Sequence, residues 1–505
     1  MRNRLLITVL GLVLLGCSAT QPSLADAQTS TPPNVIILYA DDLGYGDLSC
    51  YNPESKIPTP NLDRLAASGA KFLDGHSSSG ICTPSRYALL TGKHHWRDLY
   101  GIVKAFGKSV FKDEQLTLPE MMQANGYHTA CIGKWHLGWD WDAIRLKKGN
   151  GPDAFDWSKP IPDGPLAHGF DHYFGDTVIN FPPYTWIEDD KVAQVPDTKM
   201  STKKWPKIKE GRWEARPGPM VTGWNPYDAL PTLGDKAVSY IASRKEKDEP
   251  FFLYFAYPSP HAPIIPNDAF DGKSDAGPYG DLVVESDHIA GRILDALEKA
   301  GLDDNTIVVF SADNGPERYA YARDETFGHW SSHPLRGLKR DIYEGGHRVP
   351  FIMRWPGVIE PGSTKDALVS QIDLYATLAS RLGFTLPDHA AVDSHDMMPY
   401  LLGQSDVVRE SHVHNTKEEK FAFRHGDWLL INTKTGIGMR KDMGNWEQRH
   451  NYAPDDKGPV ELYNLSNDLS QHKNIADQHP ETVSAMQALL EKAIEDGRTR
   501  PSGSE

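Results

Sequence analysis

A cysteine, a proline and an arginine alternate with other residues at the start of the segment 81–92. Pro84 suits the first turn of a helix, because the N–H that proline lacks would have no partner there, and we expect Thr83 to cap that helix. Cys82 then lies where free backbone N–H groups and the positive end of the helix dipole favour an anion. Arg86, one turn along, can hold a tetrahedral anion through two N–H groups. The pattern predicts an anion site at Cys82; the alternative is an ordinary buried cysteine before a capped helix.

Carboxylate and amide side chains follow two apolar runs that read as buried strands. Asp41 and Asp42 come directly after the first run, and Asp313 and Asn314 follow the second. Three carboxylates and one amide are hard oxygen donors, which suit Ca²⁺ ahead of Mg²⁺ because Mg²⁺ usually keeps more of its water. Either pair alone is more typical of a cap or a turn. The two pairs are therefore candidate ligands of a cation, and the alternative for each pair is a cap or a turn.

Basic side chains form a third group. Lys134 and His136 follow another predicted strand, and their spacing of two on an extended segment places both on one side. His261 follows an aromatic strand, and Lys339 lies in the basic segment 335–340. A single lysine or histidine is usually a solvated or structural group. The functional interpretation therefore depends on these cations meeting the carboxylates and Cys82.

Most of these groups come directly after predicted strands of an α/β fold. Apolar runs at 34–40, 128–132, 251–257 and 306–311 each end in a polar cluster, and helical patterns lie between them. One helix starts with the capping box 117–120. Strand, polar cluster and helix in repetition predict a mostly parallel sheet sandwiched by helices. In such sheets, chemistry gathers beyond the carboxyl ends of the strands, where the candidate residues fall.

With 505 residues, the chain suits one large domain and one smaller domain. We assign 28–405 to the catalytic domain and 406–505 to a C-terminal α+β subdomain built on an antiparallel sheet. Within the first, 139–232 is a Trp-rich insertion that holds seven of the thirteen tryptophans. These either anchor irregular loops to the body or form stacking platforms for sugar rings.

Residues 1–27 have the features of a targeting segment. Two arginines precede the apolar run 5–16, which is too short to span a bilayer. The string 14–17 is similar to a bacterial lipobox, which would make Cys17 the lipidated first residue, whereas 25–27 offers a plain Ala-x-Ala cleavage site. Both interpretations predict an exported protein: periplasmic, anchored to the outer membrane as a lipoprotein, or secreted.

Charge and cysteine content restrict the possible partners. The net charge of -15 argues against a general binder of nucleic acid or of anionic membranes. Outside the leader, Cys50, Cys82 and Cys131 remain, which is an odd number in an oxidising compartment. At least one of them must stay unpaired or be modified.

The string from Cys82 to Gly92, Cys-x-Pro-x-Arg-x-x-Leu-Leu-Thr-Gly, resembles the signature of type I sulfatases of the arylsulfatase family. In that family a maturation enzyme oxidises the cysteine to formylglycine before folding. The clusters at 41–42, 134–136 and 313–314 also resemble family motifs, and the likeness runs from about Asn34 to Arg354 and more loosely to Ala476. The resemblance implies the alkaline-phosphatase-like fold, with a large, mostly parallel mixed sheet between helices and a smaller C-terminal subdomain.

The resemblance also implies a role for each candidate. Formylglycine at Cys82 would be the nucleophile and would share the cation with Asp41, Asp42, Asp313 and Asn314. The remaining roles are: Arg86 and Lys134 orient the nucleophile, His136 is the base that drives sulfate release, His261 protonates the leaving alcohol, and Lys339 binds the sulfate. In this chemistry one hydroxyl of the hydrated aldehyde attacks sulfur, and the other expels sulfate and restores the aldehyde.

The substrate implied is a sulfated carbohydrate, with aryl esters as poor substitutes. Two alternatives remain: a phosphonate or phosphate monoester hydrolase of the same superfamily, and a non-catalytic glycan-binding lipoprotein. Further basic residues either read additional anionic groups of the substrate or are ordinary surface charges; they are Arg318, Arg323, His329, His333 and the group 94–97.

Overall fold

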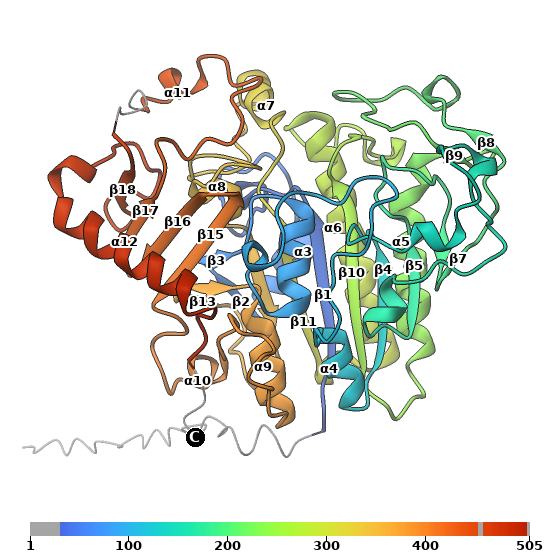
Figure 1. The fold of residues 1–505 in the computed structure, drawn as a ribbon, viewed down its shortest axis with the longest axis horizontal. Helices are drawn as coiled ribbons and strands as arrows, with labels where there is room; N and C mark the ends of the chain where they lie inside the picture. Colours follow the sequence, from blue (N-terminus) through green and yellow to red (C-terminus); the bar gives the residue numbers. More distant parts are fainter. Residues whose placement is uncertain (1–30, 453–457, 502–505) are drawn as a thin grey trace, which may run out of the picture.

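The computed structural model describes residues 31–452 and 458–501, so the predicted leader with Cys17 lies outside the described residues. Its central feature is a ten-stranded mixed sheet with the order β13-β2-β12-β11-β1-β10-β4-β5-β6-β7 (Figure 1). The five adjacent strands β11, β1, β10, β4 and β5 are parallel, whereas β12, β6 and β7 run antiparallel to their neighbours. The strands are β1 (Asn34–Asp41), β2 (Ala70–Phe72), β4 (His128–Gly133), β5 (His172–Gly175), β6 (Ile187–Glu188), β7 (Lys191–Val192), β10 (Phe251–Pro260), β11 (Thr306–Ala312), β12 (Phe351–Arg354) and β13 (Ser363–Lys365).

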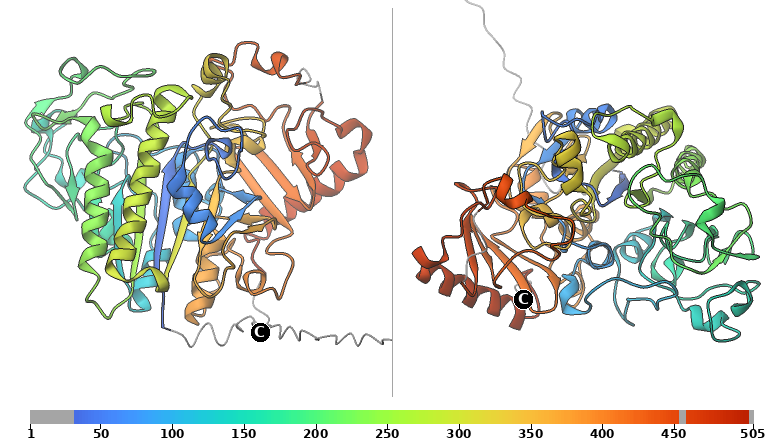
Figure 2. Two further views of the ribbon diagram at one scale, coloured as in Figure 1. Left: turned by 180° about the vertical axis from the view of Figure 1, so that it is seen from behind. Right: turned by 90° about the horizontal axis from the view of Figure 1, so that it is seen from above.

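Helices cover both faces of this sheet because its central strands are apolar on both sides. Alternate residues of β1 enter two separate cores: Val35, Ile37 and Tyr39 face one, while Ile36 and Leu38 face the other. Figures 1 and 2 show the two helical layers in front of and behind the sheet. The first core is covered by α3 (Cys82–Thr91), α4 (Leu118–Ala124) and α9 (Asp373–Leu382), and the second by α2 (Pro60–Ala67), α5 (Ala229–Ser243) and α6 (Gly277–Ala300).

Local signals in the sequence start and end several of these elements as expected. In the capping box of α4, the backbone N–H of Glu120 donates to Thr117 Oγ1 (3.3 Å) and the N–H of Thr117 donates to Glu120 Oε2 (2.7 Å). Helix α6 ends at Gly301, whose φ of 69° is left-handed, a conformation that glycine adopts without strain. The predicted mostly parallel sheet between helices is confirmed.

The C-terminal part forms a separate four-stranded antiparallel sheet with the order β15-β16-β17-β18. Its closing helix α12 (Pro480–Glu495) packs on one face of this sheet through Met486 and Leu490. In Figure 1 this sheet lies beside the strands at the β13 end of the large sheet. The strands are β15 (Ser411–Lys417), β16 (Lys420–His425), β17 (Trp428–Ile431) and β18 (Glu461–Asn464). The expected antiparallel subdomain is confirmed, although β15 was not among the predicted strands.

The Trp-rich segment contains short strands and 3₁₀ turns. Five of its seven tryptophans are buried, at Trp139, Trp141, Trp157, Trp205 and Trp224, which favours the anchoring interpretation over sugar-stacking platforms. No helix among the described residues is long and apolar enough to cross a membrane. The remaining elements are β3 (Gly75–His76) paired with β14 (Val369–Ser370), β8 (Thr198–Lys199) paired with β9 (Pro219–Met220), α7 (Ala320–Phe327), α8 (Glu344–His347), α10 (Met398–Leu401) and α11 (Trp446–Arg449).

Candidate active site

The candidate residues converge because four neighbouring parallel strands end at one edge of the sheet. The strands are β11, β1, β10 and β4, in that spatial order. Parallel strands present their carboxyl ends on the same side, so the loops that follow them meet there. Asp313 and Asn314 follow β11. Asp41 is the last residue of β1, and Asp42 follows it. His261 follows β10, and Lys134 and His136 follow β4.

Helix α3 brings Cys82 and Arg86 to the same place. The helix begins at Cys82, after the extended Ile81, and ends at Gly92. The expectation that Thr83 caps the helix is wrong: its hydroxyl donates instead to the backbone carbonyl of His136 (2.8 Å) and so fastens the helix start to the loop after β4. Arg86 is fully buried and donates from Nη2 (2.8 Å) and Nε (3.1 Å) to Asp313 Oδ2.

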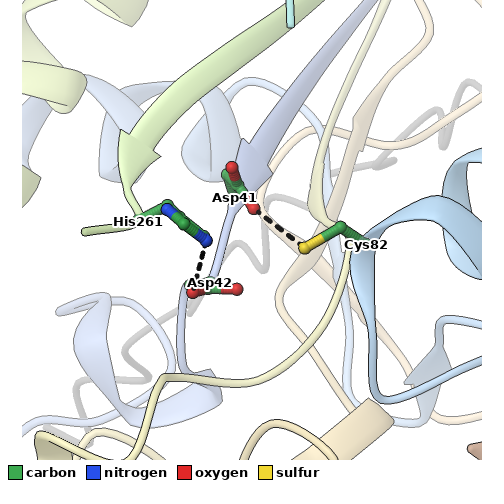
Figure 3. Close-up of side chains that lie close together, drawn as sticks. All are labelled: Asp41, Asp42, Cys82 and His261. Atoms are coloured by element: carbon green, nitrogen blue, oxygen red, sulfur yellow. Dashed lines mark hydrogen bonds and ion pairs between the residues drawn. The ribbon is translucent and has the colours of Figure 1, made fainter. Parts of the chain in front are cut away.

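Asp41 and Asp42 lie close to both Cys82 and His261 (Figure 3). Lys134 Nζ is hydrogen-bonded to Asp41 Oδ2, and Cys82 Sγ lies 3.5 Å from Asp41 Oδ1. Lys339 Nζ lies 2.6 Å from Asp42 Oδ1, and His261 Nε2 lies 3.8 Å from Asp42 Oδ2. Potential ligand atoms of Asp41, Asp42, Cys82 and His261 all fall within 4.8 Å of one another.

Burial and neighbouring charges shift the pKa values of these groups in different directions. Burial opposes ionisation of Asp41, but Lys134, His261 and Arg86 together hold its pKa below the ordinary value. Burial and then the neighbouring Asp41 raise the pKa of Asp313. Lys339 is buried as well, yet Asp42 and other acidic neighbours raise its pKa, so its ammonium stays charged. Three crowded carboxylates are therefore balanced only in part by the fixed cations around them.

The donor set fits a hard cation. Asp41, Asp42 and Asp313 are fully buried, and Asn314 presents a buried Oδ1 that has no hydrogen-bond partner among the described residues. The amide nitrogen of Asn314 is already used, since Nδ2 donates to Asp42 Oδ1 (2.7 Å) and to the carbonyl of Gly315 (2.8 Å). A buried acceptor oxygen without a donor, beside three carboxylates, is a suitable ligand for a divalent ion. The structure thus contains a possible acidic metal site.

His136 is held as a neutral imidazole. Its Nε2 donates to the carbonyl of Val103 (3.0 Å), while Nδ1 is buried and has no hydrogen-bond partner among the described residues. Burial, followed by the charges of Lys134 and Arg86, lowers the pKa of His136 well below its ordinary value. The free Nδ1 lone pair makes His136 a suitable proton acceptor.

A cavity of about 470 Å³ opens onto this cluster. Cys82, His136, His261 and Lys339 all line it. The sequence analysis missed much of the remaining wall, because these residues come from loops far apart in the chain and match no local pattern. They are Tyr100, Ile102, Asn180, Phe181, Glu214, Arg216, Glu317, Arg340 and Lys417.

Several basic residues that were considered as readers of additional anionic groups lie elsewhere. Arg323 is buried, donates to Ser331 Oγ (2.8 Å) and lies 3.4 Å above the ring of Tyr279. His329 is buried against Asp47 (2.8 Å). The histidines of the group 94–97 are also buried, and neither lines the cavity. Arg323, His329, His94 and His95 are therefore buried side chains rather than surface charges, and they do not line this cavity.

Comparison with known proteins agrees with the geometry. The family model described as Sulfatase matches residues 33–384, and one described as N-sulphoglucosamine sulphohydrolase, C-terminal, matches residues 337–500. The chain is 34% identical to an N-acetylgalactosamine-6-O-sulfatase of Bacteroides thetaiotaomicron, with 97% of this chain and 98% of the relative covered. It is 33% identical to human arylsulfatase A, with 92% and 88% covered.

A solved structure from work on the metabolism of multiple glycosaminoglycans by Bacteroides thetaiotaomicron superimposes with a TM-score of 0.77 at 32% identity. The superposition covers 92% of this chain and 99% of that one. Fold, site and sequence relatives therefore agree that the chain belongs to the sulfatase family, as a type I sulfatase of the alkaline-phosphatase-like superfamily and a sulfuric-ester hydrolase.

Proposed function

We propose that this sulfatase removes sulfate from a sulfated carbohydrate by means of a formylglycine made from Cys82. The observation that carries the proposal is the position of Cys82, at the start of α3, against Asp41 and at the base of a cavity large enough for a sugar unit. Support for a carbohydrate comes from the N-acetylgalactosamine-6-O-sulfatase that is similar over nearly the whole chain.

An unmodified Cys82 would be a poor nucleophile in this site. Burial raises the pKa of the Cys82 thiol, so the thiolate that an unmodified cysteine would need as a nucleophile is disfavoured. A hydrated formylglycine supplies two hydroxyl groups on one carbon, of which one attacks sulfur and the other expels sulfate with return of the aldehyde. Cys50 and Cys131 are also free thiols, so Cys82 has no disulfide partner among the described residues.

We propose Ca²⁺, ahead of Mg²⁺, as the ion held by Asp41, Asp42, Asp313 and Asn314 together with residue 82. When bound, it supplies positive charge for the nonbridging sulfate oxygens. Arg86 is anchored by two hydrogen bonds to Asp313 and therefore presents its charge from a fixed direction.

Two histidines on the cavity wall carry out the proton transfers, and a lysine binds the sulfate. His136 accepts a proton at Nδ1, because Val103 keeps the hydrogen of the neutral ring on Nε2. His261 faces Asp42 through Nε2, and from there its protonated form donates to the leaving alcohol oxygen. Lys339 stays charged at neutral pH and binds a sulfate oxygen.

The proposal also includes export through the leader, with lipidation at Cys17 or plain cleavage as the two routes, and a maturation enzyme that acts on Cys82. The support for export is the apolar run after two arginines in the sequence.

Mass spectrometry and paired assays test the proposal. A tryptic peptide that contains residue 82 should be roughly 18 Da lighter than the unmodified cysteine peptide, because sulfur is replaced by oxygen and two hydrogens are lost. Cys82→Ala should abolish sulfate release from 6-sulfated N-acetylgalactosamine and related sulfated sugars but leave the circular dichroism spectrum unchanged. If fully active protein carried an unmodified Cys82, the assignment of formylglycine as the nucleophile would be wrong. If the protein preferred matched phosphate or phosphonate esters, the assignment of sulfate-ester hydrolysis would be wrong.

A further inference from the structure

A second cluster of titratable groups lies away from the cavity, between the large sheet and the C-terminal sheet. It is built from the imidazoles of β3, α8 and β15 and of the segment that follows α3. All of its histidines are buried, and neighbouring rings lie between 3.5 and 5.3 Å apart, centroid to centroid. They are His76, His94, His347, His412 and His414.

Two of these imidazoles converge through their Nδ1 atoms. His76 Nδ1 and His347 Nδ1 are 2.9 Å apart. On its other side, His76 Nε2 lies 2.7 Å from Asp74 Oδ1, and Arg348 Nη1 lies 3.0 Å from the same oxygen. Because the carboxylate draws the hydrogen of His76 to Nε2, the lone pair of His76 is on Nδ1. This arrangement of carboxylate and imidazole typically orients a metal-binding histidine.

Glu344 adds a carboxylate to this pair. Its Oε2 accepts from Arg348 Nη1 (3.1 Å), but its Oε1 is buried and has no hydrogen-bond partner among the described residues. His347 Nε2 lies 3.9 Å from that oxygen and is likewise buried without a hydrogen bond. With the hydrogen of a neutral His347 shared between the two Nδ1 atoms, the Nε2 lone pair faces the lone pairs of Oε1. Two acceptors that face each other in a dry interior repel, which is a costly arrangement.

We propose that His76, His347 and Glu344 bind a divalent cation of the zinc class. Potential ligand atoms of the three residues lie within 4.8 Å of one another. Two imidazoles and one carboxylate suit Zn²⁺ far better than Ca²⁺, which takes oxygen ligands. An ion bound by these three residues would give Glu344 Oε1 the positive partner that it lacks among the described residues.

The position of the cluster gives the ion a structural role. His76 lies six residues before Cys82, and the intervening Ser77 is tied to α8 by its N–H, which donates to the His347 carbonyl (2.8 Å). One residue earlier in α8, the carbonyl of Gly346 accepts from the N–H of Gly315 (3.0 Å), which follows the proposed calcium ligand Asn314. An ion between β3 and α8 would therefore hold together the segments that carry the nucleophile and the oxygen ligands.

The test measures metal content and affinity in the full-length protein. Elemental analysis should find about one zinc-class ion per chain in addition to the ion of the active site. Protein stripped with EDTA and titrated with Co²⁺ should develop the strong visible absorption of a histidine-bound ion, and Zn²⁺ should displace it. Zn²⁺ should also raise the Tm of stripped wild-type protein.

Variants locate the ion. His347→Gln and Glu344→Gln should each weaken Zn²⁺ binding at least ~10-fold, and Asp74→Asn should weaken it by roughly 10–100-fold through loss of the orienting carboxylate. His389→Gln, at an exposed histidine, is the matched control and should bind Zn²⁺ like the wild type. Asp41→Asn should lose calcium but keep zinc, so failure of the active-site proposal can be told apart from failure of this one.

Two results would overturn the inference. If stripped wild-type protein shows neither cobalt absorption nor a zinc-dependent rise in Tm, the site is excluded. This result does not depend on whether the variants fold. Unchanged Zn²⁺ affinity in folded His347→Gln and Glu344→Gln proteins places the ion elsewhere.

Discussion

Replacing Lys339 by methionine removes a buried charge and keeps most of the side-chain volume. The ammonium lies 2.6 Å from Asp42 and 3.7 Å from Glu317, and the side chain is only 2% exposed. In the variant, Glu317 still has Arg340, which donates to both of its oxygens (2.7 and 2.8 Å). Asp42 keeps the Asn314 amide and the more distant His261. The uncompensated charge therefore falls mainly on Asp42.

Two magnitudes follow from this geometry. Breaking a buried ion pair from one side costs ~3–5 kcal/mol of stability, and the remaining contacts of Asp42 place the calcium-free variant near the lower end. Saturating Ca²⁺ should reduce the loss, because the ion supplies a partner for Asp42. Loss of a cation that contacts sulfate in the transition state should lower kcat/KM by roughly 10²–10³-fold.

The effect on stability should be independent of pH between pH 6 and pH 9. A lysine whose folded pKa is raised contributes stability fully below its unfolded pKa, near ~10.4, and loses it only as pH rises through the higher folded value. The whole window lies below both pKa values. The difference in free energy of unfolding between wild type and Lys339→Met should therefore stay constant across it.

Urea unfolding with and without Ca²⁺ measures the stability, and ion chromatography of released sulfate measures the rate. Lys417→Met is the matched control: this lysine lines the same cavity, but its ammonium donates to the backbone carbonyl of Gly438 (3.0 Å) rather than to a carboxylate. It should lose less than ~1 kcal/mol. A folded Lys339→Met enzyme within about threefold of wild-type kcat/KM would show that Lys339 does not contact the sulfate.

Three further predictions concern other parts of the molecule. Burial raises the pKa of Asp176 to about 7, so the stability of the wild type declines as pH rises from the unfolded pKa of this carboxyl toward 7. The free energy of unfolding of Asp176→Asn should therefore increase by roughly 2–3 kcal/mol relative to that of the wild type between pH 5 and pH 8. If urea unfolding gives the same difference between the two proteins at both pH values, this prediction is wrong. Chelation with EGTA should abolish sulfate release and lower the Tm, with Ca²⁺ restoring both at lower concentration than Mg²⁺; full activity in chelated, metal-free protein would exclude the ion. Thr117→Ala should lower the free energy of unfolding by ~1 kcal/mol through loss of the α4 capping box, whereas the same substitution at the exposed Thr222 should change it by less than ~0.5 kcal/mol; urea unfolding measures both.

Sequence patterns predicted what depends on local chemistry. The buried runs that became β1, β4, β10 and β11 are mostly apolar and end in polar clusters, and this local signal located the strand ends at which the candidate residues gather. The same logic found the α4 capping box. The spacing of two residues on the extended segment after β4 was enough to predict that Lys134 and His136 lie on the same side of the chain.

Features that depend on contacts far apart in the chain could not be predicted in this way. Thr83 looked like a cap, but the carbonyl of His136 offers its hydroxyl a tertiary partner instead. Strand β15 alternates too weakly in polarity to stand out, because His412 and His414 are buried by neighbours that no local pattern reveals. Arg216 reaches the cavity from the Trp-rich segment, which has no periodicity to indicate its direction.

The burial of Cys82 also determines when it can be modified. In the finished structure this residue is only 2% exposed, so the maturation enzyme that we propose would have to reach it before the sheet closes. Strand β1 is flanked by β10 and β11, which are encoded far downstream of Cys82, and Val35 pairs with Phe252 and Ile307. At about 5–20 residues per second, synthesis needs tens of seconds to proceed from Cys82 to the end of β11. The order of strands in space thus gives the nascent chain a period in which residue 82 stays accessible, and a circular permutant that makes β10 and β11 first should mature less completely.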